Sequence, residues 1–256
     1  MLRTRVIPAL LLDGQGLVKT TQFKSPVYVG DASNSCRIYN QMEVDELVLF
    51  DIRASSKALP IQFELIQQIV SECFMPICYG GGVKTLEDFR KLFYMGVEKV
   101  SVSSLLFDNP QVVKEAIKIY GAQSIIATLD IKRSRFRKVQ QVYLHNGKKR
   151  IKKSLDEVIA LLNDIGLGEI IVNNIDKEGS WEGFDCDLVR YFADNTQVPV
   201  VALGGAGSKE DIKTVVQQGH ASAVALGSMA VFQSKGMGVL IKFPKLEELK
   251  ELLGTK

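Results

Sequence analysis

Residues 76–82, PICYGGG, decide the fold because they recur about 123 residues later as residues 199–207, PVVALGGAG. In both copies a short apolar run ends in glycines. A Glu-Asp pair follows, at residues 87–88 and 210–211, within a stretch of helical periodicity. Each copy then reaches another glycine and a second apolar run. Ordered matches at one offset predict that the chain folds as two similar halves.

The same alternation extends outward over the whole chain. Eight short apolar runs cover residues 5–12, 46–51, 75–79, 99–102, 124–130, 169–173, 198–202 and 223–226. Amphipathic stretches with helical spacing cover residues 60–73, 86–93, 110–120, 154–165, 187–193, 209–218 and 245–253. Strands that are almost continuously apolar are typical of a parallel sheet buried on both faces. The pattern predicts a single (β/α)8 TIM barrel domain over residues 1–256, built from two similar half-barrels. An open, doubly wound sheet is the alternative.

Length and composition agree with such a barrel, which typically uses about 250 residues. The net charge is only +3, so composition gives no indication of a nucleic-acid partner. The four cysteines match no zinc or redox motif and are too sparse for a disulfide scaffold. We therefore expect a reduced, cytoplasmic protein with no metal site and no cofactor. The N-terminal apolar run is too short to cross a membrane.

The repeated glycines form the first candidate site. Each glycine turn follows a strand and precedes a helix, so an anion can approach backbone N–H groups at a helix N-terminus. The ends of the fourth and eighth strands would add further backbone N–H and hydroxyl groups to each anion site. The residues concerned are Gly81, Gly82, Ser103 and Ser104 in one half and Gly204, Gly205, Gly227 and Ser228 in the other. Two phosphate sites on opposite sides of the barrel mouth, and hence a phosphorylated small-molecule ligand, are predicted. Glycines that merely make turns are the alternative.

Carboxylates end several of the predicted strands. Asp130 ends the fifth strand, where a side chain points into the active face of a barrel and can move protons. Its alternatives are a helix cap or an ion pair with Lys132. Asp51 ends the second strand and could act in the same way.

Further polar residues follow the first and sixth strands. Asp176, Glu178 and Gly179 would bind ligand hydroxyl groups or simply make a turn. Lys19 lies after the first strand, where a lysine on a mobile loop could reach a phosphate. A solvated lysine is the alternative.

Residues 132–153 hold ten lysine or arginine residues and no acid. Residues 135–139 and 141–144 flank a turn-rich centre, and Asn146-Gly147 is a second turn signal. We predict a basic hairpin inserted after the fifth strand. It would recruit an anionic ligand or partner, or be only a solvated surface. Neither histidine is assigned to catalysis.

Taken together, these motifs indicate a family: nearly the whole chain resembles the cyclase subunit of imidazole glycerol phosphate synthase, the HisF family. The matching segments are RVI (5–7), DELVLFD (45–51), GGG (80–82), EKVS (98–101), LDIK (129–132), GEI (168–170), IDKEG (175–179) and GGAG (204–207). The resemblance implies a HisH-like class I glutaminase partner that docks on the N-terminal face of the barrel. Ammonia released there would travel through the barrel to the mouth, and we expect this passage to be polar.

The resemblance also implies roles for charged residues at the N-terminal face. A ring of four charged side chains gates the channel entrance in the family. The matching positions are Arg5, Glu46, Lys99 and Glu169, all of the family's residue type. Glu98 matches an acidic position that meets the glutaminase.

One position departs from the family's cyclase pattern. The family uses two catalytic aspartates, at the ends of the first and fifth strands. The second matches Asp130, but the first falls on Leu11, which cannot exchange a proton. Asp13 has the same strand parity and is the residue that could replace it, although about 7 Å further along. Glu178 stands where the family usually has aspartate.

A subgroup of the family is more similar. Residues 72–82 and 8–12 resemble the paralogues found with surface-polysaccharide genes, which are thought to deliver ammonia for amidation of a nucleotide-linked sugar. That resemblance implies a third protein, an ATP-dependent sugar amidotransferase. Three hypotheses stay open: ammonia delivery for sugar amidation, a working histidine-pathway cyclase, and a non-catalytic scaffold that activates the glutaminase.

Overall fold

The computed structural model describes residues 4–54, 56–57, 59–134 and 139–254. Its eight parallel strands are β1 (Arg5–Asp13), β4 (Leu47–Asp51), β5 (Ile77–Gly80), β6 (Lys99–Val102), β7 (Ile125–Arg133), β10 (Glu169–Asn174), β11 (Val200–Leu203) and β12 (Ala223–Leu226). Strand β1 pairs in parallel with both β12 and β4, and β7 pairs with β10, so the sheet closes on itself. The predicted (β/α)8 TIM barrel is confirmed, and an open sheet is excluded.

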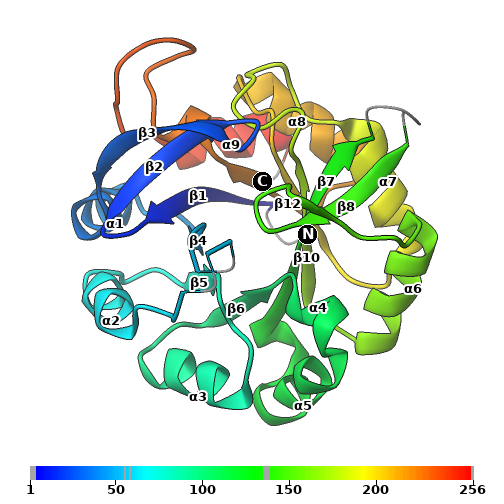
Figure 1. Ribbon diagram of the computed structural model, residues 1–256. Coiled ribbons are helices and arrows are strands. Elements are labelled where there is room, and N and C mark those ends of the chain that lie inside the picture. Colours follow the sequence, from blue (N-terminus) through cyan, green and yellow to red (C-terminus); the bar gives the residue numbers. More distant parts are fainter. Residues whose placement is uncertain (1–3, 55, 58, 135–138, 255–256) are drawn as a thin grey trace.

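Helices surround the closed barrel (Figure 1). They are α1 (Ala32–Gln41), α2 (Phe63–Ser71), α3 (Leu86–Tyr94), α4 (Leu105–Asp108), α5 (Pro110–Tyr120), α6 (Leu155–Ile165), α7 (Cys186–Asn195), α8 (Lys209–Gln218) and α9 (Leu246–Leu253), with 3-10 turns at Ala122–Ser124 and Ser228–Ala230. Each long helix buries one apolar stripe; α6, for example, buries Val158, Ile159, Leu162 and Ile165. The main core therefore lies between the strands and this ring of helices.

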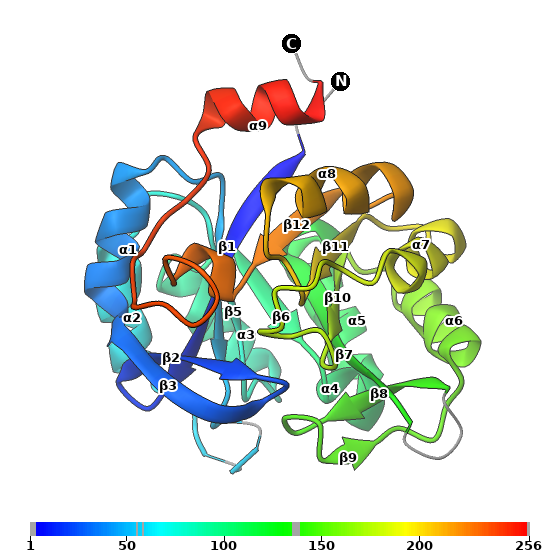
Figure 2. The same cartoon turned by 90° about the horizontal axis from the view of Figure 1, so that it is seen from above.

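Two antiparallel hairpins extend the barrel at one end. Strand β1 continues into β2 (Gly16–Thr21) and β3 (Lys24–Asp31), and β7 continues into β8 (Gln140–Leu144) and β9 (Lys149–Arg150). Figure 2 shows both hairpins at one end of the barrel and both chain termini at the other. The hairpin end is the mouth, because the parallel strands point toward it.

The sequence prediction was incomplete in both hairpin regions. The sequence places Lys19 on a mobile loop after the first strand, whereas the structure has it in β2, and α1 is not predicted because its residues are mostly polar. The hairpin after the fifth strand is present, but its first arm is the end of β7 itself. The arm predicted at residues 135–139 falls largely on residues 135–138, which lie outside the described part of the chain.

The two half-barrels match down to single hydrogen bonds. The side chain of Asp51, at the end of β4, accepts from the backbone N–H groups two and three residues further on, and Asn174 at the end of β10 does the same. Helices α3 and α8 each begin with a capping box closed by Asp88 and Asp211, respectively. These pairs are about 123 positions apart, so the repeat in the sequence corresponds to a repeat in the structure.

Candidate functional site

A cavity of about 160 Å³ opens at the mouth, between the two hairpins. Residues from both half-barrels line it. Those predicted from the sequence are Lys19, Asp51, Gly81, Gly82, Ser103, Ser104, Asp130, Glu178, Gly179, Gly204, Gly205, Gly227 and Ser228. The two glycine turns therefore share one cavity, as the duplicated motif predicted.

The glycine turns have no room for side chains. Gly81 and Gly204 adopt φ values of +133° and +92°, which L residues rarely tolerate. A Cβ atom on either would lie 2.6 Å from a backbone oxygen, that of Asp51 or Asn174. Glycine is thus required by both backbone conformation and packing, and each turn presents main chain rather than side chain to the cavity.

Asp130 is the acid that the structure places in the cavity wall. Asn173 on the neighbouring strand donates its Nδ2–H to Asp130 Oδ1 at 2.8 Å. Burial raises the pKa of Asp130 to about 7; the Glu178 carboxylate acts in the same direction, and the Asn173 hydrogen bond opposes them. No ion pair joins Asp130 to Lys132 in the described structure. Asp130 can therefore both give and take a proton near neutral pH.

Glu178 joins the first hairpin to the loop after β10. Its Oε1 accepts from the Thr20 hydroxyl at 3.0 Å and its Oε2 from the Phe23 backbone N–H at 3.1 Å. Burial raises the pKa of Glu178 against the effect of these hydrogen bonds. Gly179 packs so closely beneath the hairpin that a Cβ would lie 2.5 Å from the Thr20 carbonyl oxygen. This pair of residues holds β2 over the mouth.

Lys19 lies in strand β2 and is only 3% exposed. Its ammonium group donates to the carbonyl oxygen of Ala9. Burial lowers the pKa of Lys19 to about 8, while Glu178 acts in the opposite direction. A Cβ on Gly227 would lie 3.7 Å from Lys19 Nζ, so the ammonium group sits beside the end of the eighth strand. Both sequence alternatives, a mobile loop and a solvated lysine, are wrong about its setting.

Two predicted residues do not reach the cavity. Asp13 pairs with Arg53, with Oδ1 and Nε 3.2 Å apart, and Asp176 accepts from the Arg133 backbone N–H at 2.8 Å. Neither lines the cavity, whereas Leu11 does. The register agrees with this, because Leu11 is paired with Val18 whereas Asp13, two residues further on, is paired with Gly16 at the turn end of the hairpin. The structure therefore does not support Asp13 as a replacement for an acid at position 11.

Several cavity residues were missed by sequence reasoning. His145 and Asn146 lie in the turn between β8 and β9, and Asn146 donates to the Ile52 carbonyl oxygen at 2.8 Å. Ser101 and Thr128 share a buried hydrogen bond of 2.6 Å. The Asn146-Gly147 pair predicts a turn, but only the hairpin register shows that this turn returns the chain to the cavity.

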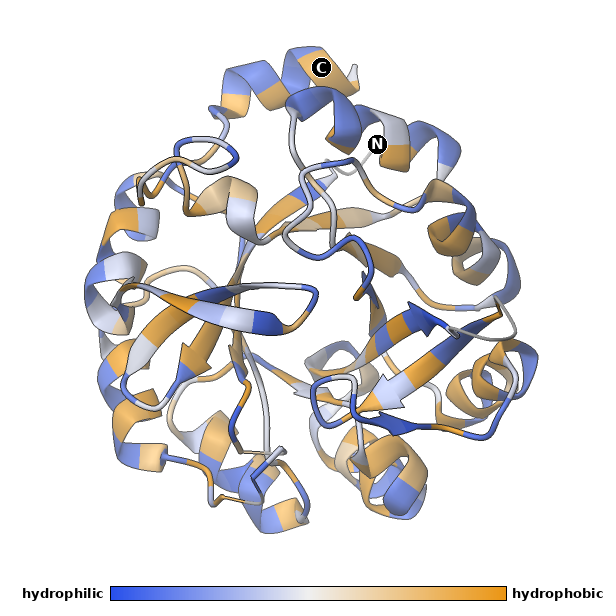
Figure 3. Ribbon diagram, turned by 45° about the horizontal axis from the view of Figure 1, so that its top comes forward, coloured by the Kyte–Doolittle hydropathy of each residue, from blue (hydrophilic) through white to orange (hydrophobic). Residues whose placement is uncertain are grey.

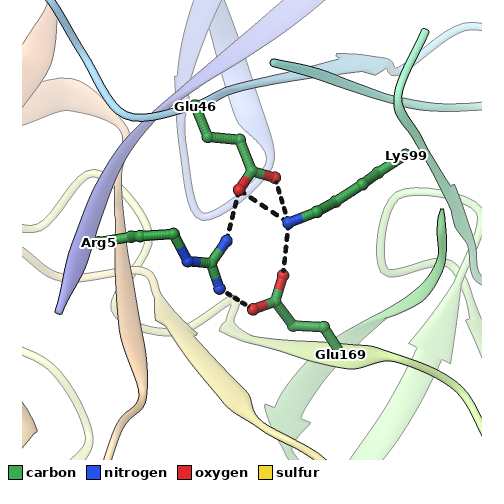
Figure 4. A network of polar contacts seen from close by, with 4 residues as sticks. All are labelled: Arg5, Glu46, Lys99 and Glu169. Carbon is green, nitrogen blue, oxygen red and sulfur yellow. Dashed lines mark hydrogen bonds and ion pairs between the residues drawn. The ribbon is translucent and has the colours of Figure 1, made fainter. Parts of the chain in front are cut away.

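At the opposite end of the barrel, four charged side chains form a closed ring (Figure 4). Arg5 donates to Glu46 and to Glu169. Lys99 Nζ lies 2.8 Å from both carboxylate oxygens of Glu46 and 3.4 Å from Glu169 Oε2. Glu46 and Glu169 are 3% and 5% exposed, so two buried carboxylates are neutralised by two cations. Burial lowers the pKa of Arg5, but Glu169 and Glu46 outweigh it and leave that pKa raised.

The barrel interior between this ring and the cavity is apolar. A separate buried cluster fills it, whose members include Ile7, Val48, Cys78, Ile126, Ile171, Val201, Ala223 and Ala225. The expectation of a polar passage is therefore wrong. Alternating strand residues that face the axis are small or branched apolar side chains, as in other filled barrels.

The surface around the ring carries exposed aromatic residues. Glu98, next to Lys99, is exposed. Phe74, in the loop before β5, and Tyr94, at the end of α3, are each 90% exposed. Aromatic residues are enriched at protein interfaces.

Other kinds of site are not found among the described residues. No group of histidine, cysteine and acidic side chains there could hold a metal ion. No described helix is long and apolar enough to span a membrane. The four cysteines are free thiols.

Comparison with known proteins adds the following. Residues 5–235 match the family described as "Histidine biosynthesis protein". The chain is 45% identical to "Putative imidazole glycerol phosphate synthase subunit hisF2" of Pseudomonas aeruginosa, over 97% of this chain and 99% of that protein. It is 43% identical to "Putative imidazole glycerol phosphate synthase subunit hisF3" of Vibrio vulnificus, over 99% of this chain and 97% of that protein. It is 35% identical to "Imidazole glycerol phosphate synthase subunit HisF" of Leptospira biflexa, over 90% and 91%.

Proposed function

We propose a function from the premise that this chain belongs to the HisF family of imidazole glycerol phosphate synthase subunits, within the histidine biosynthesis proteins. The barrel receives ammonia from a HisH-like glutaminase bound at its N-terminal face. It relays the ammonia to the mouth for amidation of a nucleotide-linked sugar in surface-polysaccharide synthesis. The acceptor reaction is carried by an ATP-dependent sugar amidotransferase.

One combination of residues carries this proposal. The charged ring of Arg5, Glu46, Lys99 and Glu169 is complete, yet Leu11 lines the cavity at the position of the family's first cyclase aspartate. A ring that admits ammonia is useful to any ammonia-consuming reaction, whereas cyclase chemistry needs both acids. Retention of the first feature without the second favours delivery over cyclisation.

The apolar interior suits this role. Ammonium would lose its hydration in such a layer at a cost of several kcal/mol, whereas neutral ammonia loses much less. Ala223 and Ala225 have small side chains, so the apolar layer is less bulky at these two positions than it would be with larger side chains. The closed ring must open for ammonia to enter, and the apolar layer must yield as it passes.

A second candidate function is favoured by Asp130. Its pKa of about 7 and its place in the cavity wall suit a general acid or base. In that case the protein would convert a ribulosyl phosphate intermediate and ammonia into imidazole glycerol phosphate and a carboxamide ribotide. With Leu11 in place of the first of the family's two acids, we expect cyclase turnover to be about 10²–10⁴-fold below that of a complete site.

Two assays separate the candidates. In a mixture of barrel, glutaminase and amidotransferase, sugar amidation supported by glutamine should require the barrel, and amidation supported by excess ammonium salt should not. If glutamine supports amidation equally well without the barrel, the relay proposal fails. In the second assay, the barrel with ribulosyl phosphate substrate and ammonium should turn over slowly, and Leu11→Asp should raise the rate. Wild-type turnover within tenfold of an ordinary cyclase would instead establish the second candidate.

A further inference from the structure

The charge of this protein is divided very unevenly. Residues 132–153 contribute ten positive charges and no negative one, although the whole chain has a net charge of only +3. All other residues together therefore carry a net charge of −7. The described strands of this basic segment belong to the hairpin at the mouth, and cations concentrated there create a local field that attracts anions.

The strand register shows which side chains of this hairpin face the mouth. Asp130 on β7 is paired with Tyr143 on β8, which is paired with Arg150 on β9; Lys132 is paired with Gln141. Directly paired residues in an antiparallel sheet share a face. Because Asp130 lines the cavity, Tyr143 and Arg150 continue the same face outward.

The opposite face of the hairpin is buried where β7 and β8 leave the barrel. Ile131 and Val142 are fully buried in the main core. Figure 3 shows the alternation of hydrophobic and hydrophilic positions along these strands. The face with Lys132, Tyr143 and Arg150 is the face that Asp130 shares, and it extends outward from the cavity wall without lining the cavity itself. On it Tyr143 is half-buried and Arg150 is exposed.

The cations on this face have no carboxylate partners. Within the described structure, neither Lys132 nor Arg150 forms an ion pair, and Arg150 donates only to the neutral amide of Gln141 at 3.3 Å. Other cations near the mouth do pair with carboxylates, as Arg53 does with Asp13 and Lys177 with Glu182. The hairpin thus offers positive charge that the protein itself does not neutralise.

We propose that this face binds the nucleoside diphosphate part of the ligand, with the diphosphate held by Lys132 and Arg150 and the base stacked on Tyr143. Guanidinium groups bind phosphate oxygens in pairs, and aromatic rings stack on nucleobases. Two strand spacings separate Asp130 from Arg150, about 10 Å. A cavity of about 160 Å³ holds only a small end of such a ligand, so the remainder lies along the hairpin. The inference deepens the proposed function, on which it rests for the mouth as the acceptor side.

Titration calorimetry of the full-length protein with uridine diphosphate and with inorganic pyrophosphate tests this site. Arg150→Ala and Tyr143→Ala should each weaken binding of uridine diphosphate by about tenfold or more. Lys149→Ala is the matched control, because it removes the same charge from the neighbouring position on β9, which is paired with Leu144 and not with Tyr143. It should change the affinity by less than about twofold.

Three results would overturn the inference. Equal weakening by Lys149→Ala and Arg150→Ala would mean a diffuse field without a defined site. Pyrophosphate that binds as tightly as uridine diphosphate, with no effect of Tyr143→Ala, would mean a plain anion site. No binding of uridine diphosphate at all would leave only a solvated hairpin. None of these measurements involves glutamine or ammonia. They therefore test the nucleotide site alone, and the amidation assay tests the ammonia relay independently.

Discussion

Replacing Asp130 with asparagine should stabilise the protein at pH 8 but much less at pH 5. Burial raises the pKa of Asp130 from 3.8 to about 7. Between these values the folded protein holds a proton that the unfolded chain has released, so the free energy of unfolding falls as pH rises. A shift of about three pKa units corresponds to about 4 kcal/mol. Since the carboxyl group opens to the cavity, solvent screens part of this, and we expect about 2 kcal/mol.

Urea unfolding of the wild type and of Asp130→Asn from pH 5 to 8 measures this effect. The stability difference should grow from pH 5 to about pH 7 and then level off, because asparagine keeps the shape of the side chain but has no charge. Glu178→Gln in the wild type should move the pH dependence to lower pH, since the Glu178 carboxylate helps to raise the pKa of Asp130. A stability difference between wild type and Asp130→Asn that is the same at every pH would refute the reasoning.

Three further predictions concern single positions. Gly204→Ala places a Cβ 2.6 Å from the backbone oxygen of Asn174 at φ +92°, so it should lower the free energy of unfolding, measured in urea, by about 3 kcal/mol or more. Gly236→Ala is the control: φ is +75° but the space around it is open, so the loss should be about 1 kcal/mol. Arg5→Met leaves two buried carboxylates with one cation and should lower the free energy of unfolding by about 2 kcal/mol; an unchanged value would argue against a structural ring. Phe74→Ala removes a ring that is 90% exposed, so it should weaken glutaminase binding by about tenfold in calorimetry while the melting temperature of the isolated barrel stays unchanged.

Much of the fold could be predicted because its strands and most of its helices correspond to local patterns of apolar and polar residues in the sequence. The eight barrel strands are short apolar runs, and the repeat around the glycine turns fixed their pairing into two halves. By contrast, α1 is mostly polar, and its buried positions include Ser35. The β2–β3 hairpin is held over the mouth by contacts that are distant in sequence. Glu178, for example, lies 158 residues from the Thr20 hydroxyl that it binds.

The candidate site was predictable where a residue ends a barrel strand. Asp130, Ser103 and Gly204 lie where their strand position indicates. Asp13 was not, because strand parity alone does not show that this residue lies at the turn end of a hairpin, paired with Gly16 and with its carboxylate beside Arg53. Lys19 was assigned to the mouth but not to a buried setting, since a lysine after a strand has no sequence signal for burial.

Ammonia transfer through the barrel is the central claim, and blocking the apolar layer tests it most directly. Ala225 is 1% exposed within that layer, so Ala225→Leu adds bulk across the path. Glutamine-supported amidation by the purified complex should fall by about tenfold or more, while glutamine hydrolysis and ammonium-supported amidation stay unchanged. Overpacking costs about 1–3 kcal/mol, so the melting temperature of the variant must be checked alongside. Undiminished glutamine-supported amidation in a folded Ala225→Leu barrel would contradict the account.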